Sequence, residues 1–292
     1  MGNLKEIRSR IASVSSTQKI TMAMKLVSAA KLRRAQTSII NLRPYANKLD
    51  EILKNLSLTM ENSEDSPLFE KRDPDNVVLV VITSNRGLCG SFNSNVIKEV
   101  HRIVREKYAI QESTGKLKLV CFGKKGYEHL CRHYKVEYFN ESLLDNSSFK
   151  ELSVITDRLI QGFLDRKIDK IDIIYNQFVN PATQKVVRTP YLPIVNETPS
   201  CKTRNNIDFI FEPSKDELLE ELIPKILRIK MFKSLIDSIA SEHGARMTAM
   251  AKASDNADEM LKELKLKYNN ARQSSITTEL LEIISGANAL DS

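Results

Sequence analysis

Two histidines, His129 and His133, stand four residues apart with Cys131 between them. Such a spacing can place metal ligands on one face of a short helix. The zinc-hydrolase motifs with this spacing, HExxH and HxxEH, also need a glutamate between the histidines. Here the intervening residues are Leu130, Cys131 and Arg132, so neither motif is met and a cation lies beside the pair. We therefore expect no metal site.

A second candidate is the loop Ser84-Asn85-Arg86-Gly87-Leu88-Cys89-Gly90, which follows an apolar run. A phosphate-binding loop would read GxxxxGK[ST], and a dinucleotide-binding loop would read GxGxxG. The loop matches neither motif, and no GxSxG elbow occurs in the chain. Cys89 could act as a nucleophile, but no base lies near it in sequence, which favours a structural role. We expect no catalytic residue and no cofactor.

The formal net charge of +7 favours an acidic partner, or simply a soluble basic protein. A basic cluster, Lys31, Arg33 and Arg34, could contact phosphate, yet it lacks interleaved aromatics and a helix-turn-helix pattern. It could equally form a solvated helix face or dock onto an acidic protein collar. We expect no nucleic-acid partner.

The cysteines, Cys89, Cys121, Cys131 and Cys201, are scattered without a CxxC pair, and no signal peptide is visible. We therefore expect reduced thiols in a cytosolic compartment. The longest apolar run, Val77 to Ile82, is too short to cross a bilayer. Any contact with a membrane should be at its surface or through a partner.

The first 57 residues carry an apolar stripe whose spacings alternate between three and four, as in the seam of a two-stranded coiled coil. The stripe fades through residues 15–18 and is expected to resume in shifted phase at Ile20, Met24 and Val27. Pro44 should kink this helix without ending it, because the stripe keeps its register on both sides. The seam residues are Leu4, Ile7, Ile11, Val14, Ile20, Met24, Val27, Leu32, Ala35, Ile39, Leu42, Ala46, Leu49, Leu53 and Leu56.

The last segment mirrors the first, so the two helices should pair in antiparallel fashion. At 1.5 Å per residue, the N-terminal helix makes a rod of about 80 Å, and the C-terminal helix outruns it by roughly 20 residues. Between Ser274 and Ala289 the only charges are Glu279 and Glu282. An apolar end of this kind usually marks an interface, although it could instead fold back on the middle domain or fray. The second seam reads Ala240, His243, Met247, Met250, Ser254, Ala257, Leu261, Leu264, Tyr268, Ala271 and Ser275.

The middle segment has the pattern of a small α/β domain. Continuous apolar runs predict buried strands over 77–83 and 117–122, and helices are expected near 96–104 and over 149–164. Two strands, 171–179 and 186–194, should form a hairpin at Asn180–Pro181, and 207–211 could add a short strand. We therefore predict an α/β fold: a long antiparallel coiled coil of the N- and C-terminal helices with a central Rossmann-like domain. The expected boundaries are 1–57 for the first helix, 58–76 for a linker, 77–211 for the α/β domain and 212–292 for the last helix.

Several motifs together resemble the γ subunits of F-type ATP synthases, in order along the whole chain. The N-terminal signature lies in residues 5–11 (KEIRSRI) and 17–24 (TQKITMAM), and the loop after the first strand in residues 86–90 (RGLCG). The strongest match is YNNARQSSITTEL at 268–280, followed by ISGA at 284–287. Residues 241–247 (SEHGARM) and 253–257 (ASDNA) also fit.

The resemblance implies a non-catalytic rotor shaft. The coiled coil would occupy the bore of a hexamer of three α and three β subunits, and the α/β domain would sit on the membrane-embedded c-ring beside the ε subunit. Ion flow would turn the ring and the shaft, driving the β sites through different nucleotide affinities. Partner contacts would fall to Met24, Arg272, Gln273, Ile276, Thr277, Leu280 and Ile284, and the family loop would comprise Arg86, Gly87, Leu88, Cys89 and Gly90.

Two departures from the family pattern stand out. Asn85 occupies a position where the family usually has an acidic residue, and Cys201 stands alone where the chloroplast branch has a redox-active pair, so no thiol switch is expected. The resemblance implies a peripheral membrane protein on the cytoplasmic face of a bacterial plasma membrane. Two other hypotheses remain: a Rossmann-like enzyme with dimerising helical arms, which should bind a ligand at Asn85–Gly90, and a nucleic-acid binder using Lys31–Arg34, which should be steeply salt-dependent.

Overall fold

A computed structural model describes residues 2–59, 67–70, 72–194 and 215–290, without the side chains of 2–3, 50, 53–59, 215–220 and 286–290. The chain divides into two compact units: residues 1–29 with 246–292, and residues 30–245. Both terminal helices, α1 (Gly2–Thr59) and α7 (Lys215–Leu290), contribute to both units. The predicted strand at 207–211 lies outside the described residues, and the predicted domain boundaries stay predictions.

The second unit is built on a five-stranded sheet in the order β3-β2-β1-β4-β5. The strands β1 (Val77–Ile82), β2 (Leu117–Phe122), β3 (Val136–Asn140) and β4 (Lys170–Phe178) are parallel to one another, and β5 (Gln184–Leu192) is the antiparallel edge beside β4. The mixed sheet confirms the predicted architecture. Strand β3 was not expected, because this edge strand is only half-buried and its sequence, VEYFN, has no continuous apolar run.

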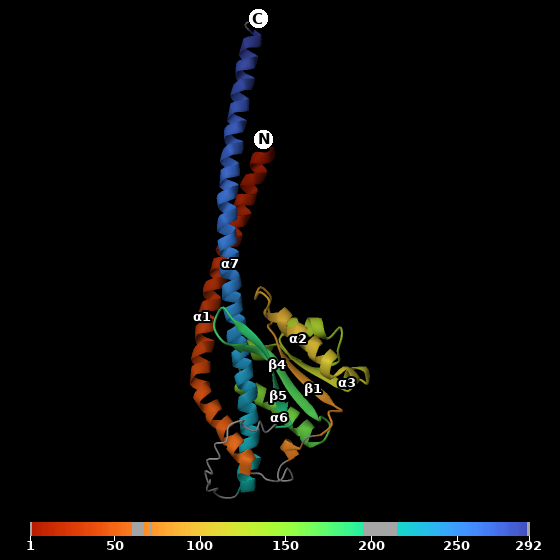
Figure 1. Cartoon of the computed structure of the whole chain (residues 1–292). Helices are drawn as coiled ribbons and strands as arrows, with labels where there is room; N and C mark the ends of the chain where they lie inside the picture. The colour runs from red at the N-terminus through yellow and green to blue at the C-terminus, as the bar shows by residue number, and fades with distance from the viewer. Residues whose placement is uncertain (1, 60–66, 71, 195–214, 291–292) are drawn as a thin grey trace. The chain divides into compact units, whose positions relative to one another are not determined.

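Helices cover the sheet on both faces (Figure 1). On one face, Val77, Leu79 and Val81 pack with residues of α2 (Phe92–Lys107) and with Leu130 of α4 (Lys124–Leu130). The alternate residues of β1 point to the other face and are also buried, which explains the continuous apolar run. Short helices α3 (Ala109–Ser113) and α5 (Ser142–Asn146) complete the connections between strands.

Helix α6 (Phe149–Leu164) matches its predicted bounds and begins where the Ser148 side chain accepts a hydrogen bond from the Glu151 amide. It joins α7 through an ion pair between Arg228 and Asp157 and an edge-to-face contact between Phe149 and Phe232. In this unit α7 is buried on every side between residues 234 and 242. A helix enclosed in this way is a core element rather than an appendage.

The segment expected to be a linker also contributes to this unit. A 3₁₀-helix, η1 (Pro67–Phe69), buries Leu68, and Arg72 lies over the ring of Phe163. Helix α1 continues through Pro44, as predicted, and its residues 32, 35, 39, 46 and 49 are buried in the expected seam. The kink at Pro44 stays a prediction.

In the first unit α1 and α7 run antiparallel. The Gln18 side chain donates a hydrogen bond to Asp258, and the Thr21 and Ser254 hydroxyls lie 2.8 Å apart, so falling numbers on α1 face rising numbers on α7. Further along, Ile7 lines the same small cleft as Ala271. The paired seam predicted for α7 is confirmed in this unit, since its members from 247 to 275 are buried or half-buried.

The predicted phase shift of the α1 seam is wrong. Thr21 and Ser28 are buried, whereas Ile20 and Val27 are 57% and 58% exposed. The seam therefore keeps its original phase, with polar residues at positions where the sequence suggested a break. Hydroxyl groups can occupy the seam because Thr21 and Ser28 donate to helix carbonyls at Gln18 and Met24.

Candidate functional site

The carboxyl ends of the parallel strands are where an enzyme of this fold would bind its ligand. The strand order reverses between β1 and β4, because β1 leads to β2 on one side and β4 lies on the other. Ligands of open α/β sheets bind in the crevice at such a switch point. If the chain were an enzyme, its ligand would bind in the crevice between β1 and β4.

Helix α7 fills this crevice. The Ser241 hydroxyl donates to the backbone carbonyl of Asn176 at the end of β4, at 3.0 Å. A Cβ on Gly244 would lie 3.1 Å from the carbonyl oxygen of Pro181, so the helix and the hairpin are in close contact. Ala245 packs with Cys89 and Phe92. A protein helix thus occupies the volume that a nucleotide would need.

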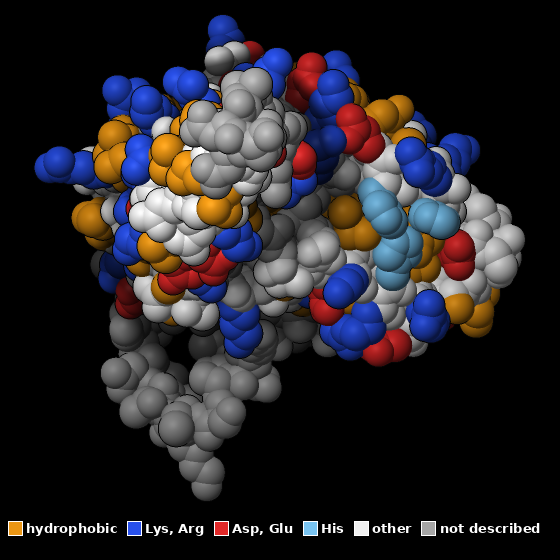
Figure 2. Space-filling view, turned by 90° about the horizontal axis from the view of Figure 1, so that it is seen from above, with side chains coloured by type: hydrophobic (Ala, Val, Ile, Leu, Met, Phe, Trp, Pro, Cys, Tyr) orange, Lys and Arg blue, Asp and Glu red, His pale blue; other side chains and the backbone are white. Residues whose placement is uncertain are grey.

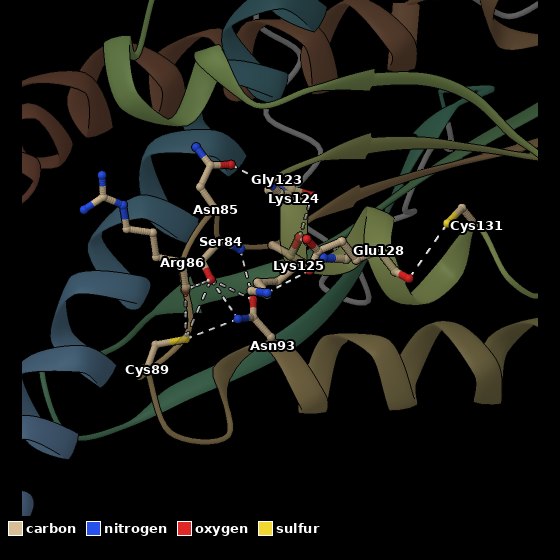
Figure 3. Close-up of polar contacts among 12 residues, drawn as sticks. Ser84, Asn85, Arg86, Cys89, Asn93, Gly123, Lys124, Lys125, Glu128 and Cys131 are labelled. Carbon is tan, nitrogen blue, oxygen red and sulfur yellow. Dashed lines mark hydrogen bonds and ion pairs between the residues drawn. The ribbon is translucent and has the colours of Figure 1, made fainter.

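The loop after β1 is braced by its own side chains (Figure 3). Ser84 is fully buried; its amide donates to the Asn93 side chain, and its hydroxyl donates to the Arg86 carbonyl. The Asn93 amide group donates to the Ser84 hydroxyl and lies 3.3 Å from the Cys89 sulfur. The loop thus closes on itself through a buried polar cluster, in which the Ser84 amide already has a side-chain partner.

Cys89 is buried within this cluster, and its sulfur lies close to the Ser84 hydroxyl and the Arg86 carbonyl. The structural role expected for this cysteine stays a prediction. The adjacent Leu88 has a φ of +62° and is 63% exposed, and Gly90 has a φ of +60°. Glycine adopts that conformation without strain, so it suits position 90, whereas Leu88 adopts it at some cost.

Asn85 faces away from the buried cluster and ties the loop to two other connections. Its side-chain amide donates to the Glu141 carbonyl at 2.8 Å and to the Asp145 carboxylate at 3.2 Å, and its oxygen accepts from the Lys124 amide. An acidic residue at position 85 could not donate a hydrogen bond to Asp145. Its negative charge would instead lie beside the negatively charged carboxylate of Asp145. The departure from the family pattern therefore fits this chain's own local contacts.

A buried carboxylate, Asp172, is the other group that resembles a catalytic residue. It is inaccessible to solvent and accepts hydrogen bonds from Tyr108 at 2.6 Å and from Arg188 at 2.9 Å. Burial and the neighbouring carboxylate raise the pKa of Tyr108 far above its usual range. Because Asp172 cannot touch a substrate, this network fixes α2 and the β4–β5 hairpin together.

Among the described residues, no group of three His, Cys, Asp or Glu side chains could hold a metal ion. Within the same part of the chain, no helix combines the length and the apolar character needed to cross a bilayer. The basic cluster Lys31, Arg33 and Arg34 is exposed on α1. On the face seen in Figure 2, blue basic and red acidic side chains are interspersed.

The predicted contact residues of α7 lie on both sides of the point where its pairing with α1 ends. If the pairing at Thr21–Ser254 continues residue for residue, α1 begins opposite about residue 274, and α7 projects alone beyond it (Figure 1). Arg272 and Gln273, in the last paired turn, and Thr277, on the free end, are exposed. So are Ile276, Leu280 and Ile284, at 49%, 54% and 55%. The side chain of Ala287 lies outside the described residues.

Met24 does not join that group. It lies on α1, close to the Thr21–Ser254 pair, and so about 30 Å along the rod from Arg272. Met24 is half-buried, but Ile20, Met22, Leu26 and Val27 around it are each more than half exposed. At about 100° per residue, Ile20 and Val27 lie on the same side of α1 as Met24, whereas Met22 and Leu26 lie on the opposite side. Ile20, Met24 and Val27 therefore form a second apolar surface, which was missed because these three residues were assigned to the seam. Their exposure, and the hydrogen bonds of Gln18 and Thr21 to α7, show that the seam lies elsewhere.

These features define a class of protein: a mixed α/β domain whose ligand crevice is filled by one of two long, paired terminal helices. A family model described as ATP synthase matches residues 3–290. The chain is 50% identical over 291 residues to the ATP synthase gamma chain of Flavobacterium johnsoniae and 46% identical over 296 residues to that of Cytophaga hutchinsonii, with full coverage of both chains in each case.

Among solved structures, the chain resembles one from the OSCP/F1/c-ring part of Euglena gracilis mitochondrial ATP synthase, with a TM-score of 0.72 at 21% identity. The match covers 99% of this chain and 95% of that one, and it confirms the fold. The chain therefore belongs to the ATP synthase family described by the matching model.

Proposed function

We propose that this chain is the γ-type central shaft of an F-type ATP synthase. It would couple ion-driven rotation of the membrane c-ring to conformational cycling of three catalytic β subunits, which alternate with three α subunits. Full-length relatives named ATP synthase gamma chain support this assignment. The structural observation that carries it is the single free end of α7, which exposes Ile276, Leu280 and Ile284 to solvent.

An exposed apolar helix end is unstable in water and stable inside an apolar collar. Because side chains such as Leu280 and Ile284 make no directional bonds, a collar can hold them without fixing one rotational position. Two charges, Glu279 and Glu282, are the only ones over residues 274–289. We infer that this end turns within the hexamer, while the apolar surface around Met24 and Val27 contacts β subunits lower in the bore.

The chain would be non-catalytic by itself. The filling of the β1–β4 crevice by Ser241, Gly244 and Ala245 supports this, because a ligand could enter only by displacing a buried helix. Proton or sodium flow would supply the work, and ATP chemistry would belong to the β subunits. The reverse direction, hydrolysis driving rotation, uses the same contacts.

The α/β domain would be the foot of the shaft, seated on the c-ring and beside the ε subunit. The chain would then be a peripheral membrane protein, attached through the ring to the cytoplasmic face of a bacterial plasma membrane. The exposed Leu88 on the braced loop is a candidate contact, because a rigid loop presents such a side chain at little entropic cost.

Co-expression with α and β subunits tests this proposal. The expected product contains one copy of this chain for three α and three β subunits, and it hydrolyses ATP. The purified chain alone should not hydrolyse ATP. Recovery of the chain only as a free protein or a homodimer, with an intact α/β hexamer present, would contradict the assignment.

A further inference from the structure

Helix α7 is held by the α/β domain on two opposite sides, and α6 supports the first of them. Arg228 of α7 forms an ion pair with Asp157 of α6, with 2.7 Å between nitrogen and oxygen. One turn further along, Phe232 makes an edge-to-face contact with Phe149 at the start of α6. Because Arg228 and Phe232 are four residues apart, they point within about 40° of each other around the helix axis. Both contacts therefore belong to one side of α7.

The β4–β5 hairpin supports the other side of α7. The buried Ser241 hydroxyl donates to the Asn176 carbonyl near the end of β4, at 3.0 Å. At the hairpin turn, a Cβ on Gly244 would lie 3.1 Å from the Pro181 carbonyl oxygen, so helix and turn are in close contact. Counted from Arg228, Ser241 lies about 220° and Gly244 about 160° around the helix axis. These two residues therefore face away from α6.

Both supports are anchored in the body of the α/β domain. In the hairpin, Arg188 of β5 donates to the buried carboxylate of Asp172 on β4, which also accepts from Tyr108 at the end of α2. On the other side, the guanidinium of Arg72 lies 4.9 Å from the ring centre of Phe163 on α6. A turn of the domain therefore carries the hairpin and α6 with it.

Support from opposite sides decides how α7 responds to a turning force. A helix that rests on one neighbour can roll over it, whereas two opposed neighbours exert a couple on the helix. The contacts extend from Arg228 to Gly244, which is about 24 Å along the helix axis. Between residues 234 and 242 the helix is also buried on every side, so close packing leaves it no room to roll or tilt there.

We propose that these opposed contacts form a torque clamp: Arg228 and Phe232 against α6 on one side, Ser241 and Gly244 against the β4–β5 hairpin on the other. The clamp transfers torque between the α/β domain and α7. This inference rests on the proposed function, in which that domain is the foot of the shaft, and it names the contacts through which foot and shaft are coupled. Arg228 and Ser241 are positioning residues, because they act by holding α7.

A rotation assay under load tests the torque clamp. The full chain with Cys201→Ser carries a bead at the exposed Cys131 of the α/β domain, and turns of the bead are counted per ATP hydrolysed by the surface-fixed α/β hexamer. Arg228→Ala/Ser241→Ala removes one directional contact from each side. Slips between α7 and the domain should become about 10-fold more frequent, because an exposed ion pair and a buried hydrogen bond together contribute roughly that factor. Turns per ATP should therefore fall with a large bead and stay at the wild-type value with a small one.

The matched control is Arg102→Ala/Ser153→Ala. It removes the same residue types and kinds of bond, but Arg102 pairs with Glu99 inside α2, and Ser153 donates to the Phe149 carbonyl inside α6. The control should keep its turns per ATP under load, and denaturant unfolding of both variants separates torque transfer from a general loss of stability. Equal turns per ATP for the clamp variant and the control at the highest load would overturn the proposal. A wild-type complex that hydrolyses ATP without turning the bead would overturn the proposed function, and the clamp with it.

Discussion

The free end of α7 gives the sharpest prediction. Ile276, Leu280 and Ile284 lie four residues apart on one side of the helix and are each about half exposed. Full burial of such a side chain contributes roughly 1.5–3 kcal/mol, so burying the exposed half in a collar contributes roughly 1 kcal/mol per residue. Replacing all three by serine should therefore weaken binding to the α/β hexamer by roughly 3 kcal/mol, or about 150-fold.

Aspartate at the same three positions should weaken binding further, because each carboxylate must also be desolvated. The assay is titration of a fluorescently labelled full chain with purified hexamer, with ATP hydrolysis by the complex as a second readout. Ile110→Ser is the matched control: Ile110 is 74% exposed, but it lies on the α/β domain, so its loss should not change binding to the hexamer. Equal affinity of the wild-type chain and the triple aspartate variant for the hexamer would refute the proposal that an apolar collar of the hexamer encloses the end of α7.

Three further predictions concern the shaft and its core. Thr21→Val alone should lower the free energy of unfolding by about 1 kcal/mol, because it leaves the Ser254 hydroxyl without its partner, whereas Thr21→Val with Ser254→Ala should recover most of the loss. Burial raises the pKa of Asp237 from 3.8 to about 6, so the folded chain keeps this proton at a pH where the unfolded chain has lost it. The contribution of Asp237 to the free energy of unfolding is therefore fully present below about pH 4 and is lost as the pH rises through about 6, where the buried carboxyl becomes charged. Because asparagine does not ionise, Asp237→Asn should raise the free energy of unfolding by up to about 3 kcal/mol at pH 8 and by little at pH 4. Gly244→Leu should destabilise by about 1–3 kcal/mol or more, because a side chain there meets the backbone of Pro181.

Denaturant unfolding of the full chain measures all three changes. For the hydroxyl pair, the double-mutant cycle is the control, and additive losses would show that Thr21 and Ser254 are not coupled. For Asp237, a stabilisation that is the same at pH 4 and pH 8 would contradict the raised pKa. For Gly244, the control is Gly87→Ala, since a Cβ at Gly87 meets no atom within 4 Å. Equal stability of Gly244→Leu and the wild-type chain would contradict the close packing in the crevice.

Sequence periodicity predicted most of the fold because burial leaves a direct trace in residue type. Strand β1 is buried along its whole length and helix α6 is amphipathic, so the bounds of both follow from their apolar patterns. The edge strand β3 is half-buried and has no such trace, so it was missed. The phase of the α1 seam was misjudged because Thr21 and Ser28 are buried polar residues, whose hydrogen-bond partners are visible only in three dimensions.

The proposed functional surfaces also differ in how far the sequence could predict them. The apolar end of α7 could be predicted, because a charge-poor stretch beyond the end of a partner helix has nothing within the pair to cover it. The exposed residues near Met24 could not, since Ile20 and Val27 also fit an alternative seam.

Rotation is the central claim, and a single-molecule experiment tests it most directly. Cys131 is exposed whereas Cys89 and Cys121 are buried, so with Cys201→Ser the chain can be labelled at one accessible thiol. A bead attached at Cys131 is observed while the α/β hexamer is fixed to a surface and ATP is supplied. The account predicts rotation in one direction with three pauses per turn, one for each β subunit. A bead that stays still on complexes that hydrolyse ATP would contradict it.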